Sequence, residues 1–287
     1  MNIFALSRRN LENQLIESGI EEEEARQEAI LILEHVTGLS VTAQIVSDMT
    51  ALEPSWQAEF ERILKKRQAR MPIQYILGKA RFMGLDLDVK PGVLIPRPDT
   101  ETLVKSVFDQ AKGRGAPGKI AEIGVGAGPI AISLLRYFQT ASLFACDISE
   151  EAVAISSLNA SRYGVADRLE LVTGDWRTTL PAELDLIVSN PPYLAFKEKQ
   201  GLAKEIGDYE PRSALFDKDD DGLGFFRAFA VLLPKHLKQS EGWLAVEFGD
   251  RQSMAVASIF ERCGWREVTI GQDVHGLARV LTALVPL

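Results

Sequence analysis

The chain has 287 residues, a formal net charge of −8 and 46% hydrophobic residues, and its pI is about 5.1. This length suits two domains, and the apolar fraction is that of a globular protein with ordinary cores. The acidic balance argues against direct stable binding to nucleic acid, and no apolar run approaches the ~20 residues of a membrane-spanning helix, so we expect no membrane association.

The first ten residues lack the apolar segment of a signal peptide. Cys146 and Cys263 have the spacing of neither a metal site nor a redox motif, and the three histidines show no ligand pairing. We therefore expect a cytoplasmic protein without a metal site, and both cysteines are predicted to be small core residues.

In residues 1–75, apolar side chains recur at helical spacing, which predicts a small helical bundle. Such a bundle would either help to bind a macromolecular substrate or serve only as a structural cap. In residues 76–95, Leu85, Leu87 and Val89 alternate with polar residues, which predicts a linking β-hairpin.

Residues 96–287 form the third predicted part, in which seven apolar segments with strand character alternate with helical patterns. Strands that alternate with helices indicate an α/β fold, with a doubly wound, mostly parallel sheet and helices on both faces. The predicted strands cover residues 120–123, 142–146, 169–173, 184–188, 243–248, 266–271 and 278–284.

The start of this part is a polar segment between prolines, Pro96 to Glu101. Asp99 or Thr100 is suited to cap the following helix. Capping does not explain why Arg97, Thr100 and Glu101 occur together, so these three are predicted to line a substrate pocket.

A glycine-rich turn follows the first predicted strand and precedes a helix. Its G-x-G-x-G pattern permits a tight turn and close approach of a ligand to the backbone. The cofactor-binding candidates in this turn are Glu122, Gly124, Val125, Gly126 and Gly128.

Asp147 ends the second predicted strand, where a carboxylate suits a ribose diol. Asp175 and Trp176 follow the third strand and are predicted to contact an adenine ring. The set indicates an adenosine-type cofactor without identifying it. Each part also has a structural interpretation: a bare strand-to-helix turn for the glycines, a helix cap for Asp147, and packing for Trp176.

The fourth strand ends in Asn190-Pro191-Pro192-Tyr193. Two prolines make this turn rigid and remove N–H donors, leaving carbonyl groups, one amide and one ring at the ligand-binding edge of the sheet. The turn is predicted to hold a planar amide or amine. Asn190, Pro191 and Tyr193 are the catalytic candidates, Pro192 joins them in substrate binding, and Asn190 is also a cofactor-binding candidate.

Together these motifs resemble class I S-adenosylmethionine-dependent methyltransferases that act on planar nitrogens. Over nearly the whole chain the sequence is similar to the peptide chain release factor glutamine N5-methyltransferases. The segments that carry this closer resemblance are residues 74–78 (Gln-Tyr-Ile-Leu-Gly), Phe82, residues 96–101 and residues 209–215 (Tyr-Glu-Pro-Arg-Ser-Ala-Leu).

The resemblance implies a seven-stranded class I methyltransferase sheet with one antiparallel strand. It also implies that S-adenosyl-L-methionine is the methyl donor, and that the acceptor is the glutamine of the Gly-Gly-Gln motif in class 1 release factors. In such a site the Asn190 side-chain oxygen and the Pro191 carbonyl would accept the amide protons, and Tyr193 would clamp the amide plane. Glu122 departs from the family's more usual Asp, and Val125 replaces its usual Thr or Cys.

Three other functions remain open at this point. A methyltransferase for exocyclic amines of nucleic acid, adenine N6 or guanine N2, would share the glycine turn and the Asn190 turn. A nicotinamide-dependent dehydrogenase would share the first strand and Asp147, but it predicts G-x-G-x-x-G spacing, which is absent. A binding module that has lost catalysis would not need an intact Asn190 turn.

Overall fold

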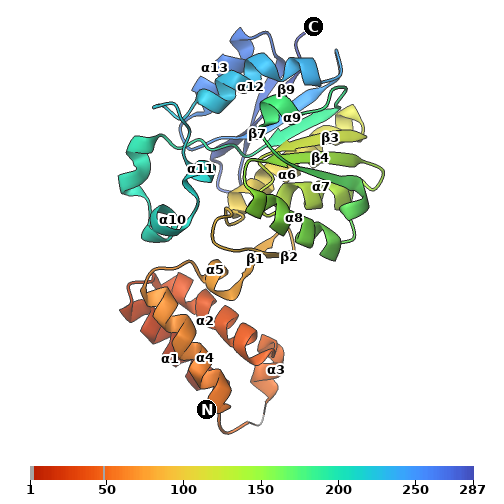
Figure 1. Ribbon diagram of the computed structural model, residues 1–287. Helices are drawn as coiled ribbons and strands as arrows, with labels where there is room; N and C mark the ends of the chain where they lie inside the picture. The colour runs from red at the N-terminus through yellow and green to blue at the C-terminus, as the bar shows by residue number, and fades with distance from the viewer. Residues whose placement is uncertain (1–2, 48) are drawn as a thin grey trace. The chain divides into compact units, whose positions relative to one another are not determined.

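The computed structural model describes residues 3–47 and 49–287, and its chain divides into two units (Figure 1). The first unit contains the chain up to Gly78 together with Lys204–Tyr209, and the second contains Lys79–Ala203 and Glu210–Leu287. Residues 1, 2 and 48 of the predicted bundle lie outside the described residues. The predicted domain boundaries at residues 75 and 95 stay a prediction.

The first unit is helical, as its apolar periodicity predicts. α2 shows why its residues form a helix: the Glu21 side chain accepts a hydrogen bond from the N–H of Glu24, and Gly38 ends the helix in the left-handed region. Apolar residues of α1, α2 and α4 form one buried core. The helices are α1 (Ile3–Glu17), α2 (Glu22–Thr37), α3 (Val41–Val46), α4 (Pro54–Gln68), α5 (Ile73–Leu77) and, from the middle of the chain, α10 (Lys204–Tyr209).

Buried ion pairs hold α10 to the rest of this unit. The Arg67 side chain is 1% exposed and contacts Glu28 at 2.9 Å and Glu205 at 2.7 Å. Arg70 contacts Glu205 at 2.6 Å, and the Tyr209 hydroxyl donates to the Ala69 carbonyl at 2.6 Å. The sequence does not predict this docking, because its partners are far apart along the chain.

In the second unit, a hairpin of β1 (Lys79–Phe82) and β2 (Leu85–Asp88) packs its apolar face into the main core. The Asn159 side chain holds this hairpin to α8 (Glu150–Arg162). It accepts a hydrogen bond from the Asp88 N–H at 2.8 Å and donates to the Asp88 carbonyl at 3.0 Å.

The main sheet confirms the predicted fold class: a doubly wound α/β sheet of seven strands, mostly parallel, with one antiparallel strand. Its strand order is β5-β4-β3-β6-β7-β9-β8, and β9 runs antiparallel to both neighbours. The fourth strand is displaced toward the carboxyl end relative to its predicted range. The strands are β3 (Lys119–Ile123), β4 (Ser142–Asp147), β5 (Leu169–Thr173), β6 (Leu186–Ser189), β7 (Trp243–Glu247), β8 (Arg266–Gln272) and β9 (Ala278–Leu284).

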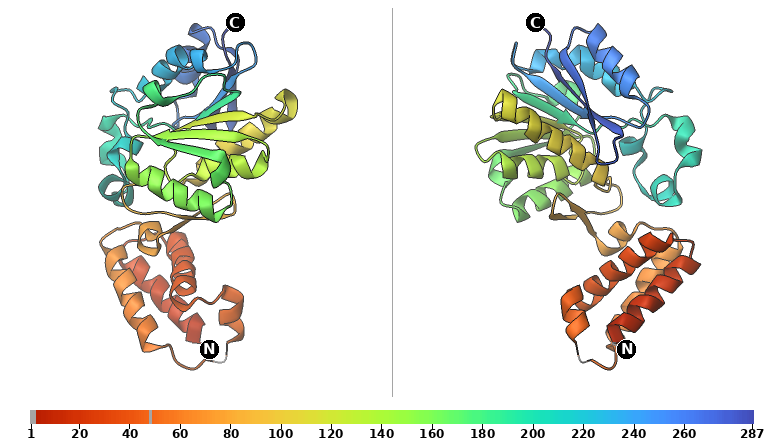
Figure 2. Two further views of the ribbon diagram at one scale, coloured as in Figure 1. Left: turned by 45° about the vertical axis from the view of Figure 1, so that its right-hand side comes forward. Right: turned by 180° about the vertical axis from the view of Figure 1, so that it is seen from behind.

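Helices cover both faces of the sheet (Figures 1 and 2). One face carries α6 (Glu101–Arg114), α7 (Pro129–Tyr137) and α8, and the other carries α9 (Trp176–Thr179), α12 (Gly224–Leu232) and α13 (Ser253–Arg262). The remaining helical segments are α11 (Arg212–Leu215) and the 3₁₀ turns Pro98–Thr100, Ala166–Arg168, Phe196–Gly201 and Pro234–His236.

Two further expectations concern burial. Cys146 is buried as predicted, but the prediction for Cys263 is wrong: it is exposed, because it lies at the carboxyl end of α13, past the last helical residue that faces the core. Within residues 3–47 and 49–287, none of the helices has the length and apolar character needed to cross a membrane.

Candidate active site

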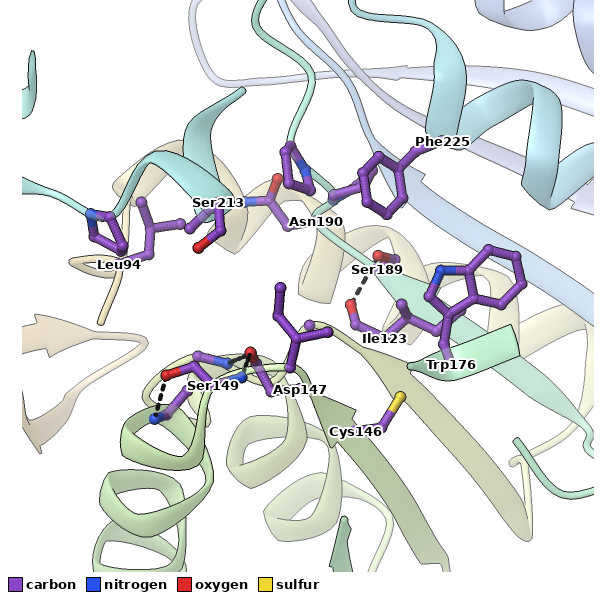
Figure 3. Close-up of a pocket in the computed structure, with 18 of the residues that line it drawn as sticks. Leu94, Ile123, Cys146, Asp147, Ser149, Trp176, Ser189, Asn190, Ser213 and Phe225 are labelled. Carbon is purple, nitrogen blue, oxygen red and sulfur yellow. Dashed lines mark hydrogen bonds between the residues drawn. The ribbon is translucent and has the colours of Figure 1, made fainter. Parts of the chain in front are cut away.

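A cavity of about 550 Å³ lies in the second unit, where the carboxyl ends of β3, β4, β5 and β6 meet (Figure 3). Parallel strands place their carboxyl ends at one edge of a sheet, which is where open α/β sheets bind ligands. The cavity is lined by residues 92–94, 123–124, 126, 146–149, 152, 174–177, 189–192, 211–214, 216–219 and 224–225. Its lining therefore includes three of the predicted motifs: the glycine turn, the segment around Asp175 and the Asn190 turn.

Asp147 lines the cavity (Figure 3), and a hydrogen bond joins its carboxylate to the glycine turn. Its Oδ2 accepts a hydrogen bond from the Gly126 N–H at 3.0 Å, and its Oδ1 accepts one from the Ser149 N–H at 3.0 Å. Burial raises the pKa of this carboxyl, while these backbone donors favour its ionised form. A carboxylate has about four acceptor positions, so Asp147 retains capacity for a ligand's hydroxyl groups.

Gly124 and Gly126 line the cavity, whereas Val125 and Gly128 do not. Gly128 serves helix packing. A Cβ atom there would lie 2.6 Å from Ser156 Oγ of α8, and its φ of +84° favours glycine in any case. Gly128 thus lets α7 begin close to α8.

Glu122 does not line the cavity and is fully buried. It shares a face of β3 with Ile120 because side chains alternate along a strand, and that face is covered by α6 and α7. Burial raises the pKa of Glu122 well above its usual value, and the backbone N–H of Ala131 in α7 acts in the opposite direction. Its contact with a cofactor stays a prediction.

Asp175 and Trp176 both line the cavity at the end of β5. Asp175 also caps α9, because its Oδ1 accepts a hydrogen bond from the Arg177 N–H at 2.9 Å. Trp176 is 5% exposed, and its ring packs edge-on against Phe229 at 5.1 Å. The ring of Trp176 therefore packs against α12, and its contact with an adenine ring stays a prediction.

Asn190, Pro191 and Pro192 line the cavity, and Figure 3 shows Asn190 across the cavity from Asp147 and next to Ser213. Asn190 Nδ2 donates to Thr100 Oγ1 at 3.0 Å. This contact joins two segments that the sequence singled out separately. It leaves the side-chain oxygen Oδ1 as the acceptor end of the amide.

Tyr193 lies behind this turn, outside the residues that line the cavity. Its hydroxyl donates to Glu247 Oε1 at 3.4 Å, and its backbone carbonyl accepts a hydrogen bond from Gln252 Nε2 at 3.0 Å. Burial, with the Glu247 charge as the next cause, raises the pKa of the Tyr193 hydroxyl. Its predicted role as a clamp on the substrate amide stays a prediction.

The three residues predicted near Pro96 are separated in the structure. Thr100 is buried against Asn190, whereas Arg97 forms an ion pair with Glu210. Glu101 accepts a hydrogen bond from the Met83 N–H at 2.9 Å and contacts Lys105 at 3.0 Å. None of the three lines the cavity, and their contact with a substrate stays a prediction.

Sequence reasoning missed the residues that support the Asn190 turn. Glu247 ends the buried strand β7, whose other four residues are apolar, and it is 1% exposed. An acidic residue at the carboxyl end of an otherwise apolar strand is a sequence pattern from which Glu247 could have been identified. Gln252 and Gly222, which contact the Tyr193 backbone, have no comparable local pattern.

Two family models match the chain. The first is described as the PrmC N-terminal domain and matches residues 8–78. The second is described as the methyltransferase small domain and matches residues 98–208, which include the glycine turn and the Asn190 turn.

Curated relatives are similar over nearly the full length. A release factor glutamine methyltransferase from Geobacter sulfurreducens is 37% identical and covers 93% of this chain and 91% of the relative. Another from Bordetella pertussis is 38% identical, with 89% and 93% covered. Among solved structures, the N-terminal domain of human METTL16 in complex with SAH has a TM-score of 0.51 at 17% identity, covering 70% of this chain and 76% of that chain. That likeness is one of fold.

Proposed function

This chain belongs to the release factor glutamine methyltransferase family, and we propose that its cavity brings S-adenosyl-L-methionine together with the glutamine side chain of a protein substrate. The chain is therefore a methyltransferase that modifies a release factor glutamine. The proposal adds that the acceptor is the amide N5 of the Gly-Gly-Gln glutamine in class 1 release factors. The observation that carries it is that the glycine turn and the Asn190 turn line one cavity.

The lining residues fit the proposed methyl donor. Gly124 and Gly126 allow close approach to the backbone, and the Asp147 carboxylate suits a ribose diol. Trp176 and Ile148 supply apolar surface for an adenine ring. When bound, S-adenosyl-L-methionine supplies an electrophilic methyl group. In agreement with this assignment, the METTL16 domain of similar fold is in complex with SAH.

The protein's own contribution concerns the acceptor nitrogen. A primary amide nitrogen is a poor nucleophile because its lone pair is delocalised into the carbonyl group. We infer that Asn190 Oδ1 and the Pro191 carbonyl accept its two N–H protons, which returns electron density to the nitrogen. The rigid proline turn holds these acceptors in place, so the nitrogen can reach a near-attack separation of ~3–3.5 Å without further reorganisation. As the nitrogen gains its methyl group, one of its two protons is released to solvent water, because an amide oxygen and a backbone carbonyl are too weakly basic to keep it.

The region of the cavity next to Asn190 suits a small peptide segment. Leu94, Ser213 and Phe225 line the cavity there (Figure 3), and they offer apolar surface with one hydroxyl group. A glutamine flanked by glycines carries no bulky neighbours, so its backbone could approach these side chains closely. A substrate of translation also implies that the enzyme acts in the cytoplasm.

The test is mass spectrometry of a purified class 1 release factor after incubation with the enzyme and S-adenosyl-L-methionine. We expect one added methyl group on the glutamine of its Gly-Gly-Gln tripeptide. Asn190→Ala should lower turnover roughly 100-fold, because one preorganised polar partner is lost, while S-adenosylhomocysteine binding by calorimetry is retained. Asn13→Ala, at an exposed position of α1, is the matched control.

Two results would reject the proposal. Turnover of Asn190→Ala within twofold of the wild type would remove Asn190 from the mechanism. Methylation of RNA or DNA, supplied in parallel reactions, with none of the release factor would favour the nucleic-acid amine as the substrate.

A further inference from the structure

Three segments that are far apart in the sequence line the side of the cavity where the acceptor amide is proposed to lie. They are residues 92–94, the Asn190 turn and residues 211–214. Figure 3 shows Ser213 next to Asn190, with Leu94 on the same side of the cavity. Each segment is short and lies outside the main sheet, so tertiary contacts must hold it in place.

Hydrogen bonds join the Asn190 turn to both of the other segments. Asn190 Nδ2 donates to Thr100 Oγ1 at 3.0 Å, which ties the turn to the chain that follows residues 92–94. Just after the turn, the Leu194 N–H donates to the Leu215 carbonyl at 3.1 Å. This second bond holds the carboxyl end of α11 to the Asn190 turn.

Glu210 closes this set of contacts into a ring at the other end of α11. Its side chain is 1% exposed, and its Oε2 accepts a hydrogen bond from the Ile95 N–H at 3.4 Å. Its Oε1 accepts a hydrogen bond from the Arg97 guanidinium group, with which it forms an ion pair. One buried carboxyl group thus joins the residue before Pro211 to the residues after Leu94.

We propose that Glu210 is a positioning residue that holds residues 92–94 and 211–214 together as one wall for the acceptor peptide. This inference rests on the proposed function, because a wall beside Asn190 has this role only where a substrate glutamine is held there. Glu210 itself does not line the cavity, so it acts through residues of the two segments, such as Leu94.

The sequence explains why a carboxyl group suits this position. Ile95 is buried, so its N–H needs an acceptor. Pro96 and Pro98 have no N–H and stiffen the chain on both sides of Arg97, so an anchor at Ile95 and Arg97 fixes the whole segment. A carboxylate has several acceptor positions, so Glu210 can serve the Ile95 N–H and the Arg97 guanidinium group at once.

Burying this carboxyl group is costly unless hydrogen bonds and a cation compensate it. Burial raises the pKa of Glu210, while Arg97 and the Ile95 N–H favour its ionised form. If Glu210 served only the Ile95 N–H, its loss would lower the stability without changing how the release factor binds. A wall for the acceptor peptide, in contrast, contacts the release factor and not the ribose of the methyl donor, since Asp147 lies across the cavity from Asn190 (Figure 3).

The test compares Glu210→Ala with the wild type on full-length release factor. We expect the KM for release factor to rise roughly tenfold and kcat to stay within about twofold, because a displaced wall weakens binding in the ground state and the transition state alike. S-Adenosylhomocysteine binding, measured by calorimetry, should be unchanged.

Asp185→Ala is the matched control. Asp185 also accepts hydrogen bonds from the backbone, from the Gly118 and Lys119 N–H groups at 2.8 and 2.7 Å, and it forms an ion pair with Lys238. It precedes β6, at the end of that strand away from the cavity. This variant should unfold at a lower urea concentration than the wild type without a change in the KM for release factor.

A double-mutant cycle distinguishes positioning from a general loss of structure. Leu94→Ala should raise the KM for release factor in the wild type, because it removes apolar surface from the wall. In the Glu210→Ala background the same substitution should change this KM by less than about twofold, since the wall is already displaced. Arg97→Ala, which removes one of the two contacts of Glu210, should also raise the KM, by a smaller factor than Glu210→Ala.

The outcomes are separable. A wild type that fails to methylate release factor refutes the proposed function. If the wild type is active, a KM for release factor in Glu210→Ala within about twofold of the wild type overturns the positioning role. A matching loss of S-adenosylhomocysteine binding, an equal rise in KM in Asp185→Ala, or additive effects of Glu210→Ala and Leu94→Ala do so too. If Glu210→Ala does not fold, Arg97→Ala decides, and an unchanged KM in that variant overturns the inference.

Discussion

Gly222 lies close to the Tyr193 carbonyl group behind the Asn190 turn, so we expect Gly222→Ala to destabilise the protein and to lower turnover. Gly222 has a φ of +71°, and a Cβ atom there would lie 2.2 Å from the Tyr193 carbonyl oxygen and 3.0 Å from Gln252 Nε2. That carbonyl oxygen already accepts a hydrogen bond from Gln252 at 3.0 Å. An added methyl group must therefore displace the backbone of the turn that carries Asn190, or displace Gly222 itself.

Gly84→Ala is the matched control. Gly84 has a φ of +73°, but a Cβ atom there would meet nothing within 4 Å. Both substitutions carry the left-handed backbone penalty of about 1–2 kcal/mol. Only Gly222→Ala adds overpacking, about 1–3 kcal/mol, and the weakened Gln252 hydrogen bond, about 1 kcal/mol. The two variants should thus differ in free energy of unfolding by about 2–4 kcal/mol, from the sum of these last two contributions.

The assay is urea unfolding followed by tryptophan fluorescence, together with kcat on release factor. Both glycines and three of the four tryptophans belong to the second unit, so one transition reports both changes. We expect Gly222→Ala to lose most turnover and Gly84→Ala to retain it. Equal destabilisation by the two substitutions, or wild-type turnover in Gly222→Ala, would refute the argument that this contact holds the catalytic turn.

Two further predictions concern buried charges. Arg67→Met should destabilise the first unit by about 3–5 kcal/mol, because it leaves Glu28 buried without its partner. Arg26→Met, at an exposed pair, should change the unfolding free energy by less than about 1 kcal/mol, and equal effects in urea unfolding would contradict this. The folded pKa of Glu247 is raised from 4.5 to about 7, so its stabilising contribution is complete below pH 4.5 and is lost as pH rises through 7, by about 3 kcal/mol. Glu247→Gln should flatten this dependence of the unfolding free energy on pH. A wild-type unfolding free energy that does not change as the pH rises through 7 in urea unfolding would be evidence against this prediction.

The chemistry-bearing turns could be recognised from the sequence because their information is local. The glycine turn and the Asn190 turn each occupy a few consecutive residues after an apolar strand, and both line the cavity. The alternation of strands and helices likewise predicted the sheet, since periodicity depends only on neighbouring residues.

Two sequence expectations depended on facts that no local pattern contains. The sequence groups Arg97, Thr100 and Glu101 as one pocket wall. In the structure Thr100 meets Asn190, whereas Arg97 and Glu101 contact Glu210 and Met83, so their contact with a substrate stays a prediction. Glu122 stands beside the glycine turn in sequence, yet its strand face is covered by α7, and which face a helix covers depends on the connection order of the whole sheet.

The sequence alone therefore established the fold class, the family resemblance and the two turns that form opposite sides of the cavity. The tertiary structure was needed for the contacts behind them, in which Asn190 donates to Thr100 at the start of α6 and the Tyr193 hydroxyl donates to Glu247 at the end of β7. It was needed equally for the docking of α10 through Arg67 and Glu205. The physical reason is the same in both cases. Hydrogen bonds and ion pairs between distant segments are set by how strands and helices pack, whereas turns and periodicities are set by residues that are adjacent in the chain.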